Sequence, residues 1–338
     1  MTKLPLLQTE NRVWRTYRGG RNIDLLLGKP SVENSAWPED WISSFVEAKN
    51  RNYIPGEGIS RVLIDGKEVS ITQAVAQDDF GPGRSEAGVL IKLLDAAERL
   101  GIQVHPTPAF SRSHFGTDYG KTECWHILGA EPGAAVYIGF REGISREKWQ
   151  SLFERQDVPG MLRALHRLEV TPGDTILVRA GTPHAIGAGC FLLEIQEPCD
   201  YTMRAETTTV AGQRLTDMQI SYGLGQEALL DCFCYEGLTE VQARERFLLK
   251  PRKVKDTVTL VSYEDTPCFA LDKITGKAEL RKDCFSTLVA LEAGTLYFDS
   301  KTLSFQTGDK IFIPYGCGSV SVECGTAMVC YPPKRGRI

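Results

Sequence analysis

Alternating apolar and polar residues recur along most of this chain and predict a protein built mainly of β-strands. On a strand with one buried face, every second side chain is apolar, and the clearest segments follow that period of two. The predicted strand regions are residues 122–129, 134–140, 168–204 and 257–332.

Residues 88–106 are ambiguous, because their composition fits a helix and their pattern fits a strand. The run from Val89 to Glu98 is rich in leucine and alanine, whereas Ile102-Gln103-Val104-His105 alternates strictly before Pro106. We predict strand, bend, strand for this region.

One segment has a helical period instead. Between residues 145 and 168, large apolar side chains recur three or four positions apart, with a break at Pro159-Gly160. We therefore predict a small helical insertion at about 145–168 within the first β domain.

Two stretches of the chain, 135 residues apart, share one pattern. Gly173-Asp174, a short apolar run and a glycine-containing bend end on His184, and Gly308-Asp309 begins a matching stretch that ends on Ser319. Such stretches are typical of jelly-roll hairpins, in which turn chemistry sets strand register. We predict two barrels, one able to hold a metal at its inward histidine and one without metal.

The alternation weakens after residue 204 and resumes at 257, which favours a domain boundary near Lys250-Pro251. We expect residues 1–250 to form the catalytic domain and residues 251–338 to form a metal-free domain.

Composition excludes several classes of protein. The 338 residues carry 39 lysines and arginines against 43 aspartates and glutamates, a formal charge of −4, so nucleic acid is not an expected partner. No apolar run is long enough to cross a membrane, and the N-terminus lacks an export signal. We expect a cytoplasmic protein, a monomer or weak homodimer, with its ten cysteines reduced.

Four residues form a candidate metal site. Gln103 and His105 are two positions apart, so both can point into one barrel, and Glu123 and His184 lie on later strands. Two imidazoles and a carboxylate are the ligands of an open catalytic zinc site, and an amide oxygen is an acceptable fourth. We therefore predict one zinc ion per chain.

The remaining histidines are not expected to bind metal. His126 has the opposite strand parity to Glu123, and we expect His114 in a loop and His166 in a helix.

Three groups of residues resemble the type I mannose-6-phosphate isomerases. They are Leu90 to Ala96 leading to Gln103-Val104-His105-Pro106, then Gly120-Lys121-Thr122-Glu123-Cys124-Trp125, and Ala180-Gly181-Thr182-Pro183-His184 with Leu193-Glu194-Ile195-Gln196. The resemblance implies two cupin barrels in the compact bacterial form. It also implies zinc-dependent conversion of mannose 6-phosphate to fructose 6-phosphate, a small-molecule sugar phosphate being the partner.

The same resemblance assigns roles to individual residues. It makes Gln103, His105, Glu123 and His184 the zinc ligands and Arg204 the active-site arginine. Lys92, Lys121 and Glu194 match residues that line the substrate pocket of the family.

The physical setting of these residues suggests their chemistry. Glu194 lies in an apolar run, where burial would raise its pKa toward that of a general base, although it could instead be the ion-pair partner of Arg204. Arg204 and Lys121 could stabilise an enediolate, and we expect Lys92 at the pocket mouth beside the phosphate.

Two other functions fit a barrel with one metal. An iron-dependent cupin dioxygenase would use a more histidine-rich ligand set than Gln103, His105, Glu123 and His184. A cupin that binds or senses a different sugar or sugar phosphate could keep the metal without turnover.

Overall fold

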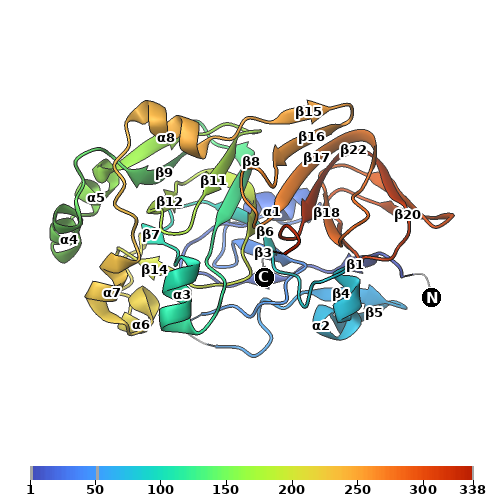
Figure 1. The fold of residues 1–338 in the computed structure, drawn as a ribbon, viewed down its shortest axis with the longest axis horizontal. Coiled ribbons are helices and arrows are strands. Elements are labelled where there is room, and N and C mark those ends of the chain that lie inside the picture. The colour runs from blue at the N-terminus through green and yellow to red at the C-terminus, as the bar shows by residue number, and fades with distance from the viewer. Residues whose placement is uncertain (1–2, 51–52, 337–338) are drawn as a thin grey trace.

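The computed structural model of the chain describes residues 3–50 and 53–336 and is mainly β, as the alternation predicted (Figure 1). Most helices gather at one end of the molecule, and the strands of the C-terminal part gather at the other. The described strands form three antiparallel sheets.

The N-terminal part contains two of these sheets. The first has the order β11 (Thr175–Val178), β8 (Glu123–Ala130), β13 (Cys190–Gln196), β6 (Leu90–Ala96), β3 (Glu39–Ile42) and β2 (Arg12–Val13). The second has the order β10 (Leu165–Glu169), β9 (Ala135–Phe140), β12 (His184–Ile186), β7 (Gln103–Val104) and β14 (Met203–Arg204).

The third sheet contains the C-terminal strands and three strands from the N-terminal region. Its order is β15 (Arg252–Val254), β16 (Thr257–Val261), β17 (Ala270–Glu279), β22 (Val320–Tyr331), β18 (Ser286–Ala290), β21 (Lys310–Ile313), β1 (Leu6–Gln8), β4 (Arg61–Ile64) and β5 (Lys67–Ser70). A hairpin of β19 (Gly294–Phe298) and β20 (Lys301–Phe305) extends from β22.

The six-stranded sheet is buried on both faces, which explains the ambiguous composition of residues 88–98. On β6, Ile91 and Leu93 pack into a core shared with Phe312 of the third sheet. Leu94 points the other way, into a core shared with Ile138 of the five-stranded sheet. A strand covered on both sides carries few polar residues and so resembles a helix in composition. Strand, bend, strand is confirmed by β6 and β7.

The helical insertion is also present, within slightly narrower bounds than expected. It consists of α4 (Arg146–Glu154) and α5 (Val158–Ala164), and Leu165 to Leu168 already belong to β10. Pro159 lies in the first turn of α5, where its missing N–H costs nothing, and Asp157 caps that turn by accepting from Gly160 N at 2.9 Å.

Other helices connect or cover the sheets. They are α1 (Arg21–Leu26), α2 (Ile71–Ala74), the 3₁₀ turn Gln77–Asp79, α3 (Pro108–Phe115), α6 (Asp217–Ser221), α7 (Gly225–Asp231) and α8 (Glu240–Phe247). The polar stretch after residue 204, where the strand period weakens, therefore contains short helices.

The repeated turn pattern has the same backbone geometry in both copies. Gly173 and Gly308 have φ of 100° and 87°, and the bend glycines Gly181 and Gly316 have φ of 84° and 94°. Only glycine adopts these angles without strain, so the pattern encodes the same hairpin twice. The fold is of the cupin type. Among the described residues, the strand pairs leave all three sheets open at their edges.

The two parts of the chain are joined by pairing between N-terminal and C-terminal strands and by buried polar contacts. β1 pairs with β21, and Lys310 Nζ on β21 lies 2.5 Å from Asp40 Oδ2 on β3. The N-terminal 70 residues therefore contribute to all the sheets except the five-stranded one. The division near residue 250 remains a proposal, with β1, β4 and β5 completing the C-terminal sheet.

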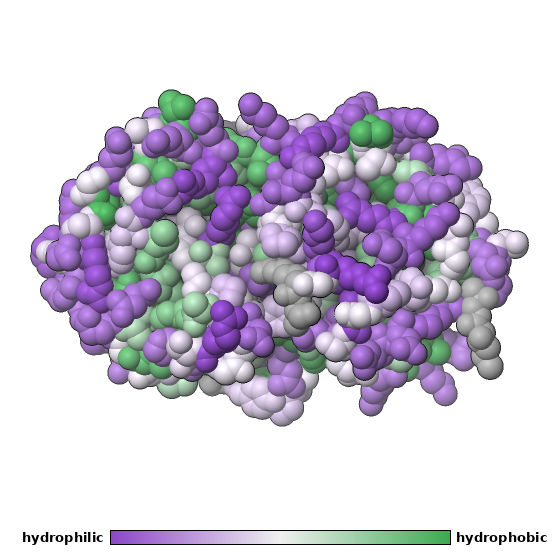
Figure 2. Space-filling view, viewed as in Figure 1, coloured by the Kyte–Doolittle hydropathy of each residue, from purple (hydrophilic) through white to green (hydrophobic). Residues whose placement is uncertain are grey.

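The outer surface in the view of Figure 2 is mostly hydrophilic, with hydrophobic residues in small separate areas. Within the described residues, no helix combines the length and apolar character needed to span a bilayer.

Candidate metal centre and pocket

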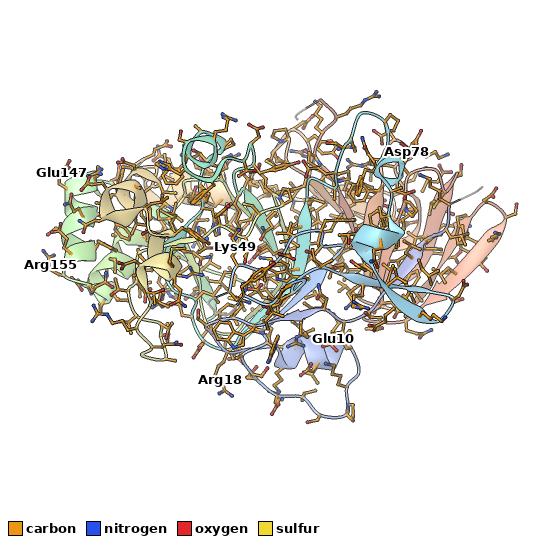
Figure 3. The ribbon with its side chains drawn as sticks, turned by 90° about the horizontal axis from the view of Figure 1, so that it is seen from below. Glu10, Arg18, Lys49, Asp78, Glu147 and Arg155 are labelled. Carbon is orange, nitrogen blue, oxygen red and sulfur yellow. The ribbon has the colours of Figure 1, made fainter. Side chains whose placement is uncertain are left out.

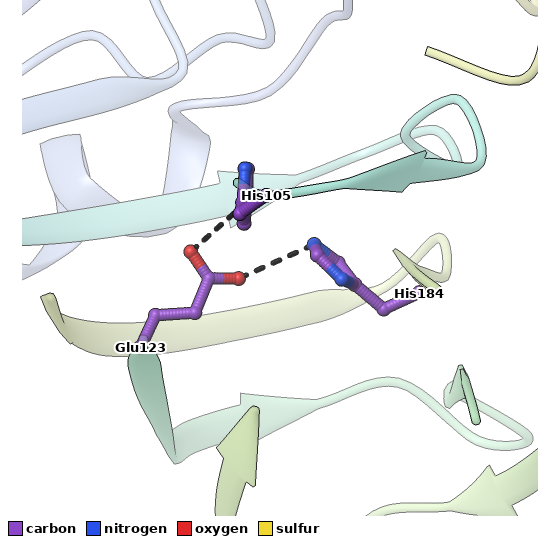
Figure 4. A group of neighbouring side chains, drawn as sticks. All are labelled: His105, Glu123 and His184. Atoms are coloured by element: carbon purple, nitrogen blue, oxygen red, sulfur yellow. Dashed lines mark ion pairs between the residues drawn. The ribbon is translucent and has the colours of Figure 1, made fainter. Parts of the chain in front are cut away.

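Two histidines and one glutamate converge in the interior of the N-terminal part (Figure 4). His105 follows β7, Glu123 begins β8 and His184 begins β12, and all three are buried. His105 Nε2 is 3.2 Å from Glu123 Oε2, and His184 Nε2 is 3.3 Å from Glu123 Oε1. The structure thus brings together three of the four predicted ligands as the strand arrangement requires.

The outer nitrogens of both imidazoles are held by backbone carbonyls. His105 Nδ1 donates to Tyr201 O at 2.9 Å, and His184 Nδ1 donates to Thr182 O at 2.9 Å. A carbonyl oxygen can only accept, so each neutral ring carries its proton on Nδ1 and a lone pair on Nε2.

Those lone pairs point at the carboxylate oxygens of Glu123. Two acceptors about 3 Å apart repel each other unless a cation or proton lies between them. In the described part of the chain, His105 Nε2 is buried without a hydrogen-bond partner. Burial also lowers the pKa of both histidines, which favours the neutral form that binds a metal. The donor set therefore fits a divalent metal.

Gln103 lies at the edge of this cluster, as the two-residue spacing predicted. Its Nε2 is 3.3 Å from His184 Nε2, and β7 pairs Gln103 with both His184 and Arg204. A half-turn of the side-chain amide would direct its oxygen to the same place.

The bend before His184 is tied to His105. Gly181 N donates to His105 O at 2.8 Å, and its positive φ lets the chain turn back onto β12 directly afterwards. The Gly-Thr-Pro-His sequence therefore fixes the separation of the two imidazoles.

A pocket enclosing about 800 Å³, including open solvent at its mouth, lies against the cluster. All the sequence-predicted catalytic and substrate-binding residues contribute to its wall. They are Lys92, Lys121, Glu194 and Arg204.

The pocket wall contains a row of alternating buried charges. Lys92 Nζ is 3.1 Å from Glu194 and 3.9 Å from Glu39, and Arg15 joins Glu39 to Asp200 with contacts of 3.0 Å to each. Each buried charge thus has an opposite charge beside it, as burial requires.

Glu39 is the most heavily bonded carboxylate in this row. It accepts from Tyr17 Oη and Trp41 Nε1, each at 2.7 Å. Burial alone would raise the pKa of Glu39, but Arg15, Lys92 and these donors outweigh it and hold the pKa at about 2. Glu39 therefore stays ionised and fixes the two cations.

Arg15, Glu39 and Asp200 were not given roles from the sequence. The available signal was two adjacent acidic residues in a buried strand, since Glu39 on β3 lines the pocket, Trp41 packs against Lys92, and Asp40 between them faces Lys310. Strand alternation places Glu39 on the same face as Lys92 of the neighbouring β6, but that pairing cannot be read from one sequence.

The structure corrects two expectations about Lys92 and Glu194. Lys92 does not lie at the pocket mouth, because its side chain is 3% exposed and its ammonium packs over Trp41. Glu194 forms an ion pair with Lys92 and not with Arg204. The expected effect of burial is present, since desolvation raises the pKa of Glu194 against the opposing effect of Lys92.

Two expectations about the other histidines were also wrong. His114 lies in α3 and not in a loop, and His166 lies in β10 and not in a helix. Neither belongs to the described metal cluster, and His126 bonds to Thr175.

Ser319 does not point inward as the repeat suggested. It is exposed and precedes β22, whereas His184 is buried and begins β12.

We expect Ser319→Ala to leave zinc content and turnover within a few fold of the unchanged protein, measured by metal analysis and steady-state kinetics. A loss of about 100-fold, equivalent to about 2.7 kcal/mol of transition-state stabilisation, would contradict this prediction.

No protein-family model matched the chain, but the relatives found by comparison with known proteins share one name. Mannose-6-phosphate isomerase ManA of Bacillus subtilis is 28% identical over 241 residues, which cover 70% of this chain and 71% of that protein. The mannose-6-phosphate isomerase of Streptococcus mutans is 38% identical over 126 residues, 37% of this chain and 38% of that one.

Solved structures share the fold over nearly the whole chain. The crystal structure of mannose 6-phosphate isomerase from Bacillus subtilis has a TM-score of 0.75 at 22% identity, covering 97% of this chain and 99% of that one. A zinc-bound mannose 6-phosphate isomerase has a TM-score of 0.73 at 17% identity with the same coverage.

Proposed function

We propose that this member of the type I mannose-6-phosphate isomerase family interconverts mannose 6-phosphate and fructose 6-phosphate. The observation that supports this most strongly is the convergence of His105, Glu123 and His184 on one point beside the pocket, whose wall includes Glu123. The names of its relatives point to the same reaction.

The metal in this proposal is one zinc ion per chain, held by His105, Glu123, His184 and the amide oxygen of Gln103. Among the described residues, the three buried ligands form the one such group, and a structural neighbour is zinc-bound. When bound, zinc would stabilise negative charge on the sugar oxygens without adding redox chemistry.

Glu194 is the proposed general base. Isomerisation moves one proton from C2 to C1 of the open-chain sugar through a cis-enediol, so one carboxylate can accept the proton and return it. Burial raises the pKa of Glu194, which makes it a stronger base than an exposed glutamate. Lys92 holds the Glu194 carboxylate at 3.1 Å and limits its movement. We propose that Lys92 also contacts the sugar hydroxyls within the pocket.

Lys121 and Arg204 are the proposed donors to the negative charge of the enediolate. Lys121 is 4% exposed and its Nζ is 3.8 Å from Glu123 Oε2, so it lies beside the metal cluster. Arg204 lies on β14, which pairs with the Gln103 strand. Fixed cations near the reacting oxygens cost little reorganisation when charge develops.

We also propose that the enzyme acts in the cytoplasm as a monomer or weak homodimer. All ten of its cysteines are free thiols, which suits a reducing compartment.

The proposed function is tested by assaying the zinc-loaded protein with mannose 6-phosphate, coupled to detection of fructose 6-phosphate. We expect turnover, about one equivalent of zinc by metal analysis, loss of activity with a chelator and its return with zinc. Zinc-loaded protein that does not convert mannose 6-phosphate would contradict the substrate, and two equivalents of zinc would contradict the single site.

A further inference from the structure

A second hollow adjoins the wall of the proposed active-site pocket. Thr16 and Arg204 line both spaces, and Lys49 and Tyr222 are among the other residues of the second. This hollow encloses about 1040 Å³, open solvent at its mouth included. Arg204 therefore lies where the two spaces meet.

Most cations of the first pocket already have a carboxylate partner. Arg15 is paired with Asp200 and Lys92 with Glu194, as described above. Arg99 forms a bidentate ion pair with Glu206, with hydrogen bonds of 2.6 Å and 2.9 Å. A phosphate group would have to compete with these carboxylates for charges that are already balanced.

Arg204 and Lys49 differ from those cations. Arg204 donates to the backbone carbonyls of Thr202 and Gln219, and burial lowers its pKa. Lys49 is exposed, with its ammonium 4.6 Å from the centre of the Tyr201 ring. Neither forms an ion pair with a carboxylate among residues 3–50 and 53–336. Arg204 interacts electrostatically with Asp200 and Lys49 with Glu47, but within those ranges neither cation is held in a close ion pair, so an added anion would not have to displace a carboxylate.

The backbone of Lys49 is held in place relative to the pocket. Lys49 N donates to Asp200 Oδ2 at 2.8 Å. Tyr201, which follows Asp200 in the sequence, provides the carbonyl that accepts from His105. Figure 3 shows Lys49 near the middle of the long axis, away from Glu147 and Arg155 at the helical end. Its exposed side chain thus projects from a segment anchored to the site.

We propose that the second hollow is the phosphate subsite and that Lys49 binds the phosphate of the sugar phosphate there, while Arg204, where the two spaces meet, acts on the enediolate. This inference rests on the proposed function and adds a residue that determines substrate specificity. The phosphate dianion gains a cation that is not held in an ion pair, whereas an unphosphorylated sugar gains nothing from Lys49. Lys49 would thereby make the enzyme prefer phosphorylated over free hexose.

Two methyl glycosides, whose sugar rings cannot open, test this subsite without turnover. Methyl α-mannoside 6-phosphate and methyl α-mannoside differ only in the phosphate, and calorimetric titration gives the affinity of the zinc-loaded protein for each. We expect Lys49→Met to weaken binding of the phosphorylated glycoside about tenfold and to leave the plain glycoside unchanged. Lys49→Arg should retain most of the preference.

Kinetics and a matched control complete the experiment. With mannose 6-phosphate, Lys49→Met should lower kcat/KM about tenfold, mainly through KM. Lys253→Met removes an exposed lysine on β15, away from both hollows, and should change neither measurement.

Equal affinity of the unchanged protein and Lys49→Met for the phosphorylated glycoside would overturn the inference. A lack of preference for the phosphorylated glycoside in the unchanged protein would overturn it as well. If the unchanged protein bound that glycoside through Lys49 but did not convert mannose 6-phosphate, the subsite would stand and the proposed reaction would fail.

Discussion

His184→Ala should lose both bound zinc and isomerase activity while the protein stays folded. His184 supplies one of three converging ligand atoms, and a site left with His105, Glu123 and the weaker amide of Gln103 holds a divalent ion far less tightly. We expect substoichiometric zinc after dialysis and turnover reduced by about 1000-fold or more, because the remaining charges act without the metal. Metal analysis and the coupled assay measure the two losses in one preparation.

The fold should survive this substitution because most of the core does not depend on the cluster. Ile138 and Trp125 belong to a hydrophobic core around His184, and the C-terminal part has a separate core. Circular dichroism should show the same strand content, with a lower melting temperature.

His114→Ala is the matched control for the loss of an imidazole. His114 is exposed on α3, so this variant should keep full zinc and full activity. Full activity in His184→Ala would remove His184 from the metal site.

The sequence could predict the metal cluster because its local signals are strong. The spacing of Gln103 and His105 sets a common face on one strand, and the bend at Gly181 fixes where His184 begins the next. Both depend on residues within a few positions of each other. The meeting of His105 with His184 and with Glu123 had to come from the fold, because Gln103 of β7 and His184 of β12 are 81 residues apart.

The charged row behind the cluster could not be predicted in the same way. Lys92 was expected at the pocket mouth because alternation gives the face of a strand but not its depth in the sheet. Within its sheet, β6 pairs with β3 on one edge and with β13 on the other, which places Lys92 between Trp41 and Glu194. Those partners are 51 and 102 residues away in sequence, and their pairing is a property of the sheet order.

The contribution of N-terminal strands to the C-terminal sheet could not be predicted, for a related reason. β1 contains only Leu6–Gln8, too short to show a period, yet it lies between β21 and β4. Buried contacts such as Lys310 with Asp40 then connect this sheet to the strand that carries Glu39. The C-terminal part thus supports the pocket wall from behind, which agrees with the expectation that Ser319 takes no part in the chemistry.

Arg204→Ala should keep its zinc and yet lose about 100-fold or more in turnover of mannose 6-phosphate. Arginine is not a zinc ligand, and the side chains of the metal cluster do not depend on Arg204 for a hydrogen bond. Removing one oriented donor to a developing oxyanion costs about 2.7 kcal/mol or more. Turnover and metal content together therefore separate this variant from His184→Ala, which should lose both.

A structural role for Arg204 makes different predictions. Its guanidinium donates to Gln219 O in α6, so alanine at this position could act by loosening that helix. In that case the melting temperature would fall and turnover would follow the folded fraction. Arg214→Ala, at an exposed arginine ten residues along the chain, controls for the loss of a positive charge in this segment.

Arg204→Lys distinguishes the two roles further. Lysine has a single charged group in place of a planar fork, so it should recover only part of the lost turnover while leaving zinc content unchanged. Normal turnover of mannose 6-phosphate by Arg204→Ala, with zinc bound, would show that Arg204 only supports α6. The charge that stabilises the enediolate would then have to come from Lys121, which lies beside Glu123.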